Sequence, residues 1–318
     1  MSVESHPDPR IVRVRAELER DGLDAVVLTH PNDVVYTTGY GSVLERWGLQ
    51  EPLSAAIVAR RGPVVLLAPQ ALLGLLPLRA DGTTPVRADE LRVFELLNFC
   101  QMGRAPDPDA RPSALADAVV QGFGERVKGE CKSDVMTALA AALRAHGLAH
   151  ARIGFDDLRV GTLLASRYGC GEIKVEDALD AMVRARIVKT APELEAFRRI
   201  GAIGDAIVEF AASRVRPGMV WTDVQCDIAD FMTRNDVIPV DDGAMLFGGA
   251  FRGEFLPEIF RTRHDGALAS GQIVILEMLG LTQQFWIDIN RTAVLGEPTR
   301  EFSALHDLVR DGFLHMVS

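Results

Sequence analysis

Two carboxylates and one imidazole in the second half of the chain are candidate functional groups. Glu277 lies inside an apolar run, residues 273–279, where a buried carboxylate without a partner would be costly. Asp288 follows 11 residues later, and His264 precedes both in a charged segment that contains a turn. Carboxylates and imidazole are groups that suit manganese, cobalt or zinc. The alternatives are that Glu277 and Asp288 are ordinary strand residues facing solvent and that His264 is a solvated loop histidine.

The two carboxylates fall on segments with the composition of β-strands. Residues 272–279 and 285–294 are rich in β-branched and aromatic side chains. Residues 280–284 between them contain glycine and polar residues, which are typical of a turn. We therefore expect Glu277 and Asp288 on two consecutive strands.

A long helix is predicted to precede these strands. Its N-cap is Thr190, whose hydroxyl can accept a hydrogen bond from an amide of the first turn while Glu193 reaches back to the cap amide. Pro192 is tolerated there because first-turn amides have no partner within the helix. Apolar residues recur at three- and four-residue spacing until residues 216–218, Arg-Pro-Gly, end the pattern. Residues 221–234 repeat the pattern and predict a second helix.

The first half of the chain alternates helical and strand patterns. One apolar helical face runs from Ile11 to Arg20, and Asp21 and Gly22 end that helix. The further predicted elements are a strand at 23–29, a loop at 30–33, a hairpin of strands 55–59 and 64–68, helices at 114–121 and 135–146, and a strand at 151–156. Strands that alternate with helices indicate an α/β domain. The strongest domain boundary is expected near residues 187–192.

Composition and charge limit the classes of function. The 318 residues are 48% hydrophobic and 25% charged, which is typical of a soluble globular protein of about two domains. The formal net charge is −10 and the basic residues are scattered, which argues against a nucleic-acid-binding surface. Four widely spaced cysteines indicate reduced thiols, and no segment has the pattern of a secretory signal or of a membrane span. We therefore expect a cytoplasmic protein with no nucleic-acid or membrane partner.

Seven short sequence blocks occur in a defined order along the chain. They are Asp24–Val27, Tyr36–Tyr40 (expected to be a loop), Arg186–Thr190, Pro192–Glu195, Arg216–Met219, Ser270–Val274 and Trp286–Gly296. Together they resemble blocks of the pita-bread superfamily, which contains Xaa-Pro aminopeptidase, prolidase and creatinase. The resemblance covers residues 11–313 and implies an α/β creatinase-type N-terminal domain over residues 1–185. It implies an α+β pita-bread catalytic domain over residues 186–318.

The resemblance also implies a set of site residues. Metallopeptidases of this superfamily bind two divalent ions through two aspartates, one histidine and two glutamates, and the ions activate a bridging water. Asp288 fills the place of the second aspartate, whereas Glu277 stands where the first is expected and moves the carboxylate by roughly 1.5 Å. Asn290 is expected to hydrogen-bond Asp288 or a substrate. Arg291 is expected to anchor an ion pair that supports the site.

Departures from the family pattern leave three functions open. Phe260 stands where metallopeptidases have a histidine, and His264 lies four residues beyond it. The first function is metal-dependent hydrolysis of a C–N bond in a short peptide, as in Xaa-Pro aminopeptidase and prolidase, with manganese, cobalt or zinc. The second is a metal-free, creatinase-like amidinohydrolase that uses a histidine base, for which His264 is the candidate. The third is a catalytically inactive homologue that binds a ligand.

Partners and chain length are further expectations from the resemblance. The substrate is expected to be a small zwitterion or a short peptide, and the protein to form a homodimer. The chain ends inside a predicted helix that spans residues 302–313 and continues beyond them. Roughly 80–100 residues of the family's catalytic domain would follow, so we expect an incomplete pita-bread domain, its first half only.

Overall fold

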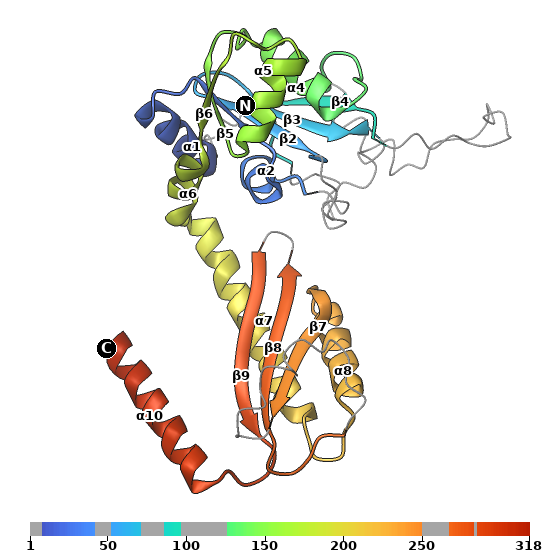
Figure 1. The fold of residues 1–318 in the computed structure, drawn as a ribbon, viewed down its shortest axis with the longest axis vertical. Coiled ribbons are helices and arrows are strands. Elements are labelled where there is room, and N and C mark those ends of the chain that lie inside the picture. The colour runs from blue at the N-terminus through green and yellow to red at the C-terminus, as the bar shows by residue number, and fades with distance from the viewer. Residues whose placement is uncertain (1–7, 42–51, 71–85, 97–125, 250–266, 283–284) are drawn as a thin grey trace, which may run out of the picture. The chain divides into compact units, whose positions relative to one another are not determined.

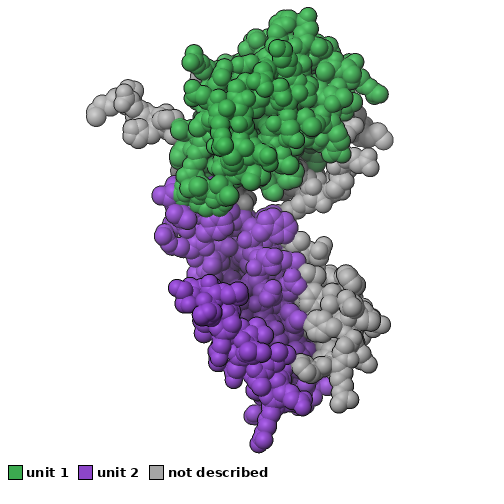
Figure 2. All heavy atoms as spheres, turned by 60° about the vertical axis from the view of Figure 1, so that its left-hand side comes forward, with its two compact units in different colours: residues 1–190 green, residues 191–318 purple. Residues whose placement is uncertain are grey.

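Two compact units make up the structure, a computed structural model that describes residues 8–41, 52–70, 86–96, 126–249, 267–282 and 285–318. The units comprise Met1–Thr190 and Ala191–Ser318 and are coloured separately in Figure 2, and Figure 1 labels the helices and strands of both. The boundary between the units lies after residue 190, five residues beyond residue 185, the predicted end of the first domain. The predicted helix at residues 114–121 and the candidate His264 lie outside the described residues.

A six-stranded sheet in the order β4-β3-β2-β1-β5-β6 forms the centre of the first unit. Its strands are β1 (Ala25–Leu28), β2 (Ala55–Ala59), β3 (Val64–Pro69), β4 (Glu90–Phe94), β5 (Arg152–Phe155) and β6 (Lys174–Asp177). β1 pairs antiparallel with β2 and parallel with β5, and β2 and β3 form the predicted hairpin. Every residue of β1, β2 and β3 is buried, which explains why these strands are continuous apolar runs in the sequence.

Helices cover both faces of this sheet (Figure 1). They are α1 (Pro9–Arg20), α2 (Pro31–Thr38), α4 (Val135–Ala145), α5 (Leu158–Arg167) and α6 (Leu179–Ile187). α1, α2 and α6 share one core with Val26 and Leu28 of β1, whereas α4 and α5 share the other with Ala25 and Val27. Successive side chains of a strand point to opposite faces, so β1 contributes to both cores. The predicted helices at the positions of α1 and α4 are confirmed.

The loops predicted at residues 30–33 and 36–40 are wrong, because most of these residues belong to α2. The helix begins at Pro31, and it ends before Gly39, which adopts a left-handed conformation with φ of 73°. The amide that proline lacks would have no partner in the first helical turn, and its fixed φ suits a helix. Pro31 therefore starts a helix, although the sequence around it predicts a loop.

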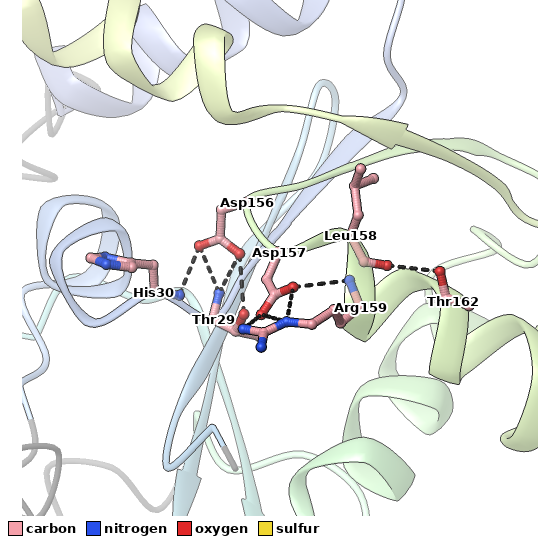
Figure 3. A network of polar contacts seen from close by, with 7 residues as sticks. All are labelled: Thr29, His30, Asp156, Asp157, Leu158, Arg159 and Thr162. Atoms are coloured by element: carbon pink, nitrogen blue, oxygen red, sulfur yellow. Dashed lines mark hydrogen bonds and ion pairs between the residues drawn. The ribbon is translucent and has the colours of Figure 1, made fainter. Parts of the chain in front are cut away.

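The Asp156 carboxylate connects the carboxyl ends of the parallel strands β1 and β5 (Figure 3). It accepts hydrogen bonds from the Thr29 amide at 2.9 Å, the Thr29 hydroxyl at 3.1 Å and the His30 amide at 2.8 Å. Burial raises the pKa of Asp156, and these hydrogen bonds oppose that rise. The neighbouring Asp157 caps α5 by accepting from the Arg159 amide at 2.9 Å.

Asp33, in the first turn of α2, carries a buried carboxylate that is 2% exposed. Its Oδ1 lies 2.9 Å from Nη1 of Arg186, near the end of α6. Burial raises the pKa of Asp33 to about 6, although the Arg186 charge lowers it, and the nearby Asp156 adds to the rise. The ion pair therefore offsets only part of the cost of burying this charge.

The second unit combines a three-stranded antiparallel sheet, in the order β7-β8-β9, with helices on one face (Figure 1). Its elements are α7 (Ala191–Arg214), α8 (Trp221–Arg234), β7 (Ile238–Gly249), β8 (Ile273–Thr282), β9 (Phe285–Val294) and α10 (Arg300–Val317). α8 and β9 have the predicted bounds, and α7 begins directly after the predicted cap residue Thr190. Val274, Leu276 and Met278 of β8 are buried in one core with side chains of α7 and α8.

α10 confirms the helix predicted from residue 302 onward, and it has no buried residue. Leu308, for example, is 70% exposed. In the part of the chain that the structure describes, no helix is both long and apolar enough to cross a bilayer.

We expect Gly280→Ala to destabilise the second unit. A Cβ at this position of β8 would lie 2.3 Å from Cγ1 of Val237 and 2.7 Å from Cε of Met232, and overpacking a filled core costs about 1–3 kcal/mol. Gly201→Ala is the matched control, because nothing lies within 4 Å of a Cβ added there on α7. The control should stabilise the helix by up to about 1 kcal/mol. Denaturant unfolding measures both, and a Gly280→Ala variant as stable as wild type would contradict this packing.

Asp33 should make the stability of the first unit depend on pH. Its pKa of about 6 in the folded protein is above the ordinary 3.8, so the folded state binds this proton more tightly than the unfolded chain. This contribution favours folding at low pH and is lost as the pH rises through 6. Asp33→Asn removes it, so the unfolding free energy of the variant minus that of wild type should rise by about 2 kcal/mol from pH 4 to pH 7.5.

Denaturant titrations of both proteins at the two pH values test this. Asp157→Asn is the control, because the Arg159 side chain holds the pKa of Asp157 below its usual value. The unfolding free energy of this variant minus that of wild type should therefore change little between pH 4 and pH 7.5. A difference for Asp33→Asn that is the same at both pH values would show that Asp33 does not titrate in this window.

Candidate functional site

The β8–β9 hairpin has one face that packs against helices and one open face. Phe285 of β9 contacts Phe197 of α7, with 4.7 Å between the ring centroids. A Cβ on Gly204 of α7 would lie 3.6 Å from Ile289 and 3.9 Å from Ile287, so these side chains also face the helix. Because side chains alternate along a strand, the residues between them face the other way.

The open face brings together three of the predicted site residues. Asp288 and Asn290 of β9 alternate with the helix-facing residues, and Glu277 of β8 pairs directly with Asn290. Leu279 pairs directly with Asp288, which makes Glu277 and Asp288 diagonal neighbours on one face. Diagonal neighbours have Cα atoms about 7–8 Å apart, within reach of long side chains. The two carboxylates can therefore turn toward one ligand.

Alternation also explains how Glu277 is accommodated in an apolar run. Val274, Leu276 and Met278 are buried under the helices, whereas Glu277 is half-buried on the open side. Asp288 and Asn290 are exposed. Both carboxylates therefore keep contact with water, and neither carries the cost of an unpaired buried charge.

Arg291 does not join these three residues. It pairs with Leu276, whose side chain is buried on the helix-packed side, so Arg291 belongs to the opposite face of the sheet. Its side chain is exposed, and Nη1 donates to the Asn290 carbonyl at 2.7 Å. The supporting ion pair predicted for Arg291 stays a prediction. His264 lies outside the described residues, so its catalytic role also stays a prediction.

The open face of β8 and β9 has an acidic character. Glu277 and Asp288 are its charged residues, since Arg291, the third charged residue of the two strands, lies on the other face. Carboxylate oxygens are suitable ligands for manganese or zinc. Among the described residues, however, no group of three His, Cys, Asp or Glu side chains comes together to hold a metal ion. The two carboxylates of the hairpin alone would not complete a metal centre.

Trp286 is a residue of this face that the sequence reasoning did not single out as a site residue. It lies two positions before Asp288, pairs with Leu281 across the hairpin and is 53% exposed. The two-residue spacing from Asp288 within a predicted strand is the signal that could have identified it. The open face thus carries an exposed aromatic side chain beside its acidic group.

Comparisons with known proteins agree with this architecture. The model of the creatinase/prolidase N-terminal domain matches residues 10–188, and the model of metallopeptidase family M24 matches residues 195–318. A Sinorhizobium fredii protein described as an uncharacterized hydrolase/peptidase is 24% identical over 306 residues, which are 94% of this chain and 67% of the relative.

Two solved structures illustrate the shared fold. The prolidase of Pyrococcus horikoshii OT3 is 16% identical with a TM-score of 0.63, and the match covers 96% of this chain and 70% of the prolidase. The X-Pro aminopeptidase of Thermotoga maritima MSB8 is 14% identical with a TM-score of 0.62, and the match covers 95% of this chain and 69% of the aminopeptidase. These matches confirm the predicted fold class. Since the N-terminal-domain model alone matches more than half of the chain, the protein belongs to the creatinase/prolidase family of pita-bread proteins.

Proposed function

We propose that the open face of the β8–β9 hairpin is the catalytic surface of a hydrolase that cleaves a C–N bond in a short peptide, with the preference of an Xaa-Pro peptidase. The observation that carries the proposal is the placement of Glu277 and Asp288 as diagonal neighbours on one face. The family relationship supports it, because part of the chain matches the M24 metallopeptidase model.

The chain's own residues have distinct roles in this proposal. Glu277 and Asp288 supply negative charge at one point of the face, where they hold a cation against the sheet. A divalent ion bound there would supply a water of lowered pKa and a Lewis acid for the substrate carbonyl. Asn290, directly opposite Glu277, can donate its amide hydrogens to a carboxylate or to the substrate carbonyl. The remaining ligands of such an ion would come from outside the hairpin.

A second candidate is a metal-free, creatinase-like amidinohydrolase. The observation that favours it is Glu277 itself, which replaces the shorter aspartate expected at a metal-binding position. Coordination tolerates changes in ligand distance of only about 0.2 Å, so an added methylene matters. The same pair of carboxylates would then bind a cationic group of the substrate. A homologue that binds such a ligand without cleaving it is the third candidate.

Location, assembly and metal belong to the proposal as well. We infer a cytoplasmic location, as the sequence predicts, and a homodimer from the family resemblance. Manganese, cobalt or zinc is the expected ion, because carboxylate and imidazole groups suit all three.

Loss of either carboxylate should abolish hydrolysis. Asp288→Asn and Glu277→Gln remove a charge without changing the side-chain volume, and we expect kcat/KM for an Xaa-Pro dipeptide to fall at least about 100-fold. Arg234→Gln is the control, because it removes an exposed charge from α8, outside the hairpin, and should stay within a few-fold of wild type. Steady-state assays of the purified full-length proteins measure the change. Equal losses in all three variants would indicate general damage to the second unit, and no loss in the carboxylate variants would exclude this face as the site.

Metal content should distinguish the candidate functions. For a metallopeptidase, elemental analysis should find bound transition metal that Glu277→Gln and Asp288→Asn lose, because each removes the negative charge of one carboxylate. A chelator should then remove activity, and added metal should restore it. Activity that persists without metal would identify the metal-free hydrolase. Ligand binding with neither metal nor turnover would identify the inactive homologue.

A further inference from the structure

An apolar shelf lies next to the acidic group on the open face of the hairpin. Its members are Trp286 and the residue opposite it, Leu281, together with Leu279, which is opposite Asp288. Leu279 and Leu281 are half-buried, whereas Trp286 is 53% exposed. The shelf therefore shares a row of the sheet with one of the proposed site carboxylates.

The direction of Trp286 is fixed by its neighbours in β9. Phe285 on one side contacts Phe197 of α7, and Ile287 on the other is buried in the helix-packed core. Strand alternation then requires Trp286 to project from the same face as Asp288. Trp286 lies two residues from Asp288, and two residues of a strand span about 6.8 Å. The indole can therefore reach the substrate residue next to a group bound at Asp288.

An exposed indole is suited to contact with an apolar ligand group. Tryptophan offers a large, rigid surface with few rotatable bonds, so a ligand that covers it gains contact area at little entropic cost. No basic residue of β8 or β9 lies on this face, since Arg291 belongs to the other one. The shelf is continuous with the proposed catalytic group, which makes the substrate its occupant.

We propose that Trp286 is a specificity-determining residue, and that it contacts a large apolar side chain flanking the scissile bond of the substrate. The proposal rests on the proposed function, because it takes Asp288 and Glu277 as the place where the bond is cleaved. It predicts that the enzyme prefers leucine over alanine at the residue next to that bond. Each additional methylene in an apolar contact is worth about 10-fold in discrimination.

Binding and hydrolysis of the dipeptides Leu-Pro and Ala-Pro by the full-length protein test the proposal. Calorimetry should give wild type at least about a 10-fold preference for Leu-Pro. Trp286→Ala should reduce this preference below about 3-fold while leaving Ala-Pro almost unchanged, and Trp286→Phe should keep most of it because the ring still covers the ligand. Leu308→Ala is the control, since it removes an exposed apolar side chain from α10, outside the hairpin.

The outcomes separate this inference from the proposed function. A Trp286-dependent preference in binding without hydrolysis would support the shelf and overturn the hydrolase. Hydrolysis with the same preference in wild type and Trp286→Ala would keep the hydrolase and overturn the shelf. A wild-type protein that binds neither dipeptide, or binds both equally, would also overturn the shelf.

Discussion

The arrangement of the candidate site depends on the alternation of side chains in β8 and β9. One face of the hairpin is committed to the core beneath α7 and α8, where Val274, Met278 and Ile287 are buried. A shift of one residue in register would move every side chain of the strand to the other face. The packing of these apolar residues thus holds Glu277 and Asp288 on the open face, although neither makes the contacts that fix the register. The core of the second unit thus determines the position of the proposed site.

The first unit buries carboxylates, whereas the hairpin of the second unit leaves them in contact with water. Asp33 and Asp156 are placed where burial raises their pKa, and hydrogen bonds or an ion pair compensate in part. Arg186, the partner of Asp33, stands near the end of α6, directly before the segment that leads to the second unit. Arg13 of α1 donates to the backbone carbonyls of Val188 and Lys189 in that segment. These polar contacts hold residues 186–189, at the end of the first unit, against α1 and α2.

Much of the fold could be predicted because local signals and burial agree. α8 has the bounds its apolar spacing predicts, and the buried strands β1, β2 and β3 stand out as apolar runs. Other elements lack such signals. β6 is a short strand with two exposed residues among its four, so no apolar pattern marks it. The sequence does not predict α2, because a proline such as Pro31 occurs both in turns and at the first position of a helix.

The candidate site was only partly predictable for a related reason. Asn290 and Arg291 are adjacent in sequence and both are predicted to support the site, yet consecutive strand residues point to opposite faces. Trp286 was missed as a site residue because a tryptophan in a strand is more often a core residue than a ligand contact. Family patterns identify positions, but the face of the sheet decides which positions can act together.

The register of β8 and β9 changes the interpretation of the glutamate at position 277. A diagonal pair on a sheet begins with Cα atoms about 7–8 Å apart, and its carboxylates meet only if the side chains lean toward each other. A side chain longer by roughly 1.5 Å makes this convergence easier across the diagonal, even though it would spoil a rigid geometry built for aspartate. Glu277 is half-buried beside apolar neighbours, which limits its rotamers and lowers the entropy lost on binding. In the proposed function, Glu277 would therefore hold a cation at a different place between the strands than an aspartate would.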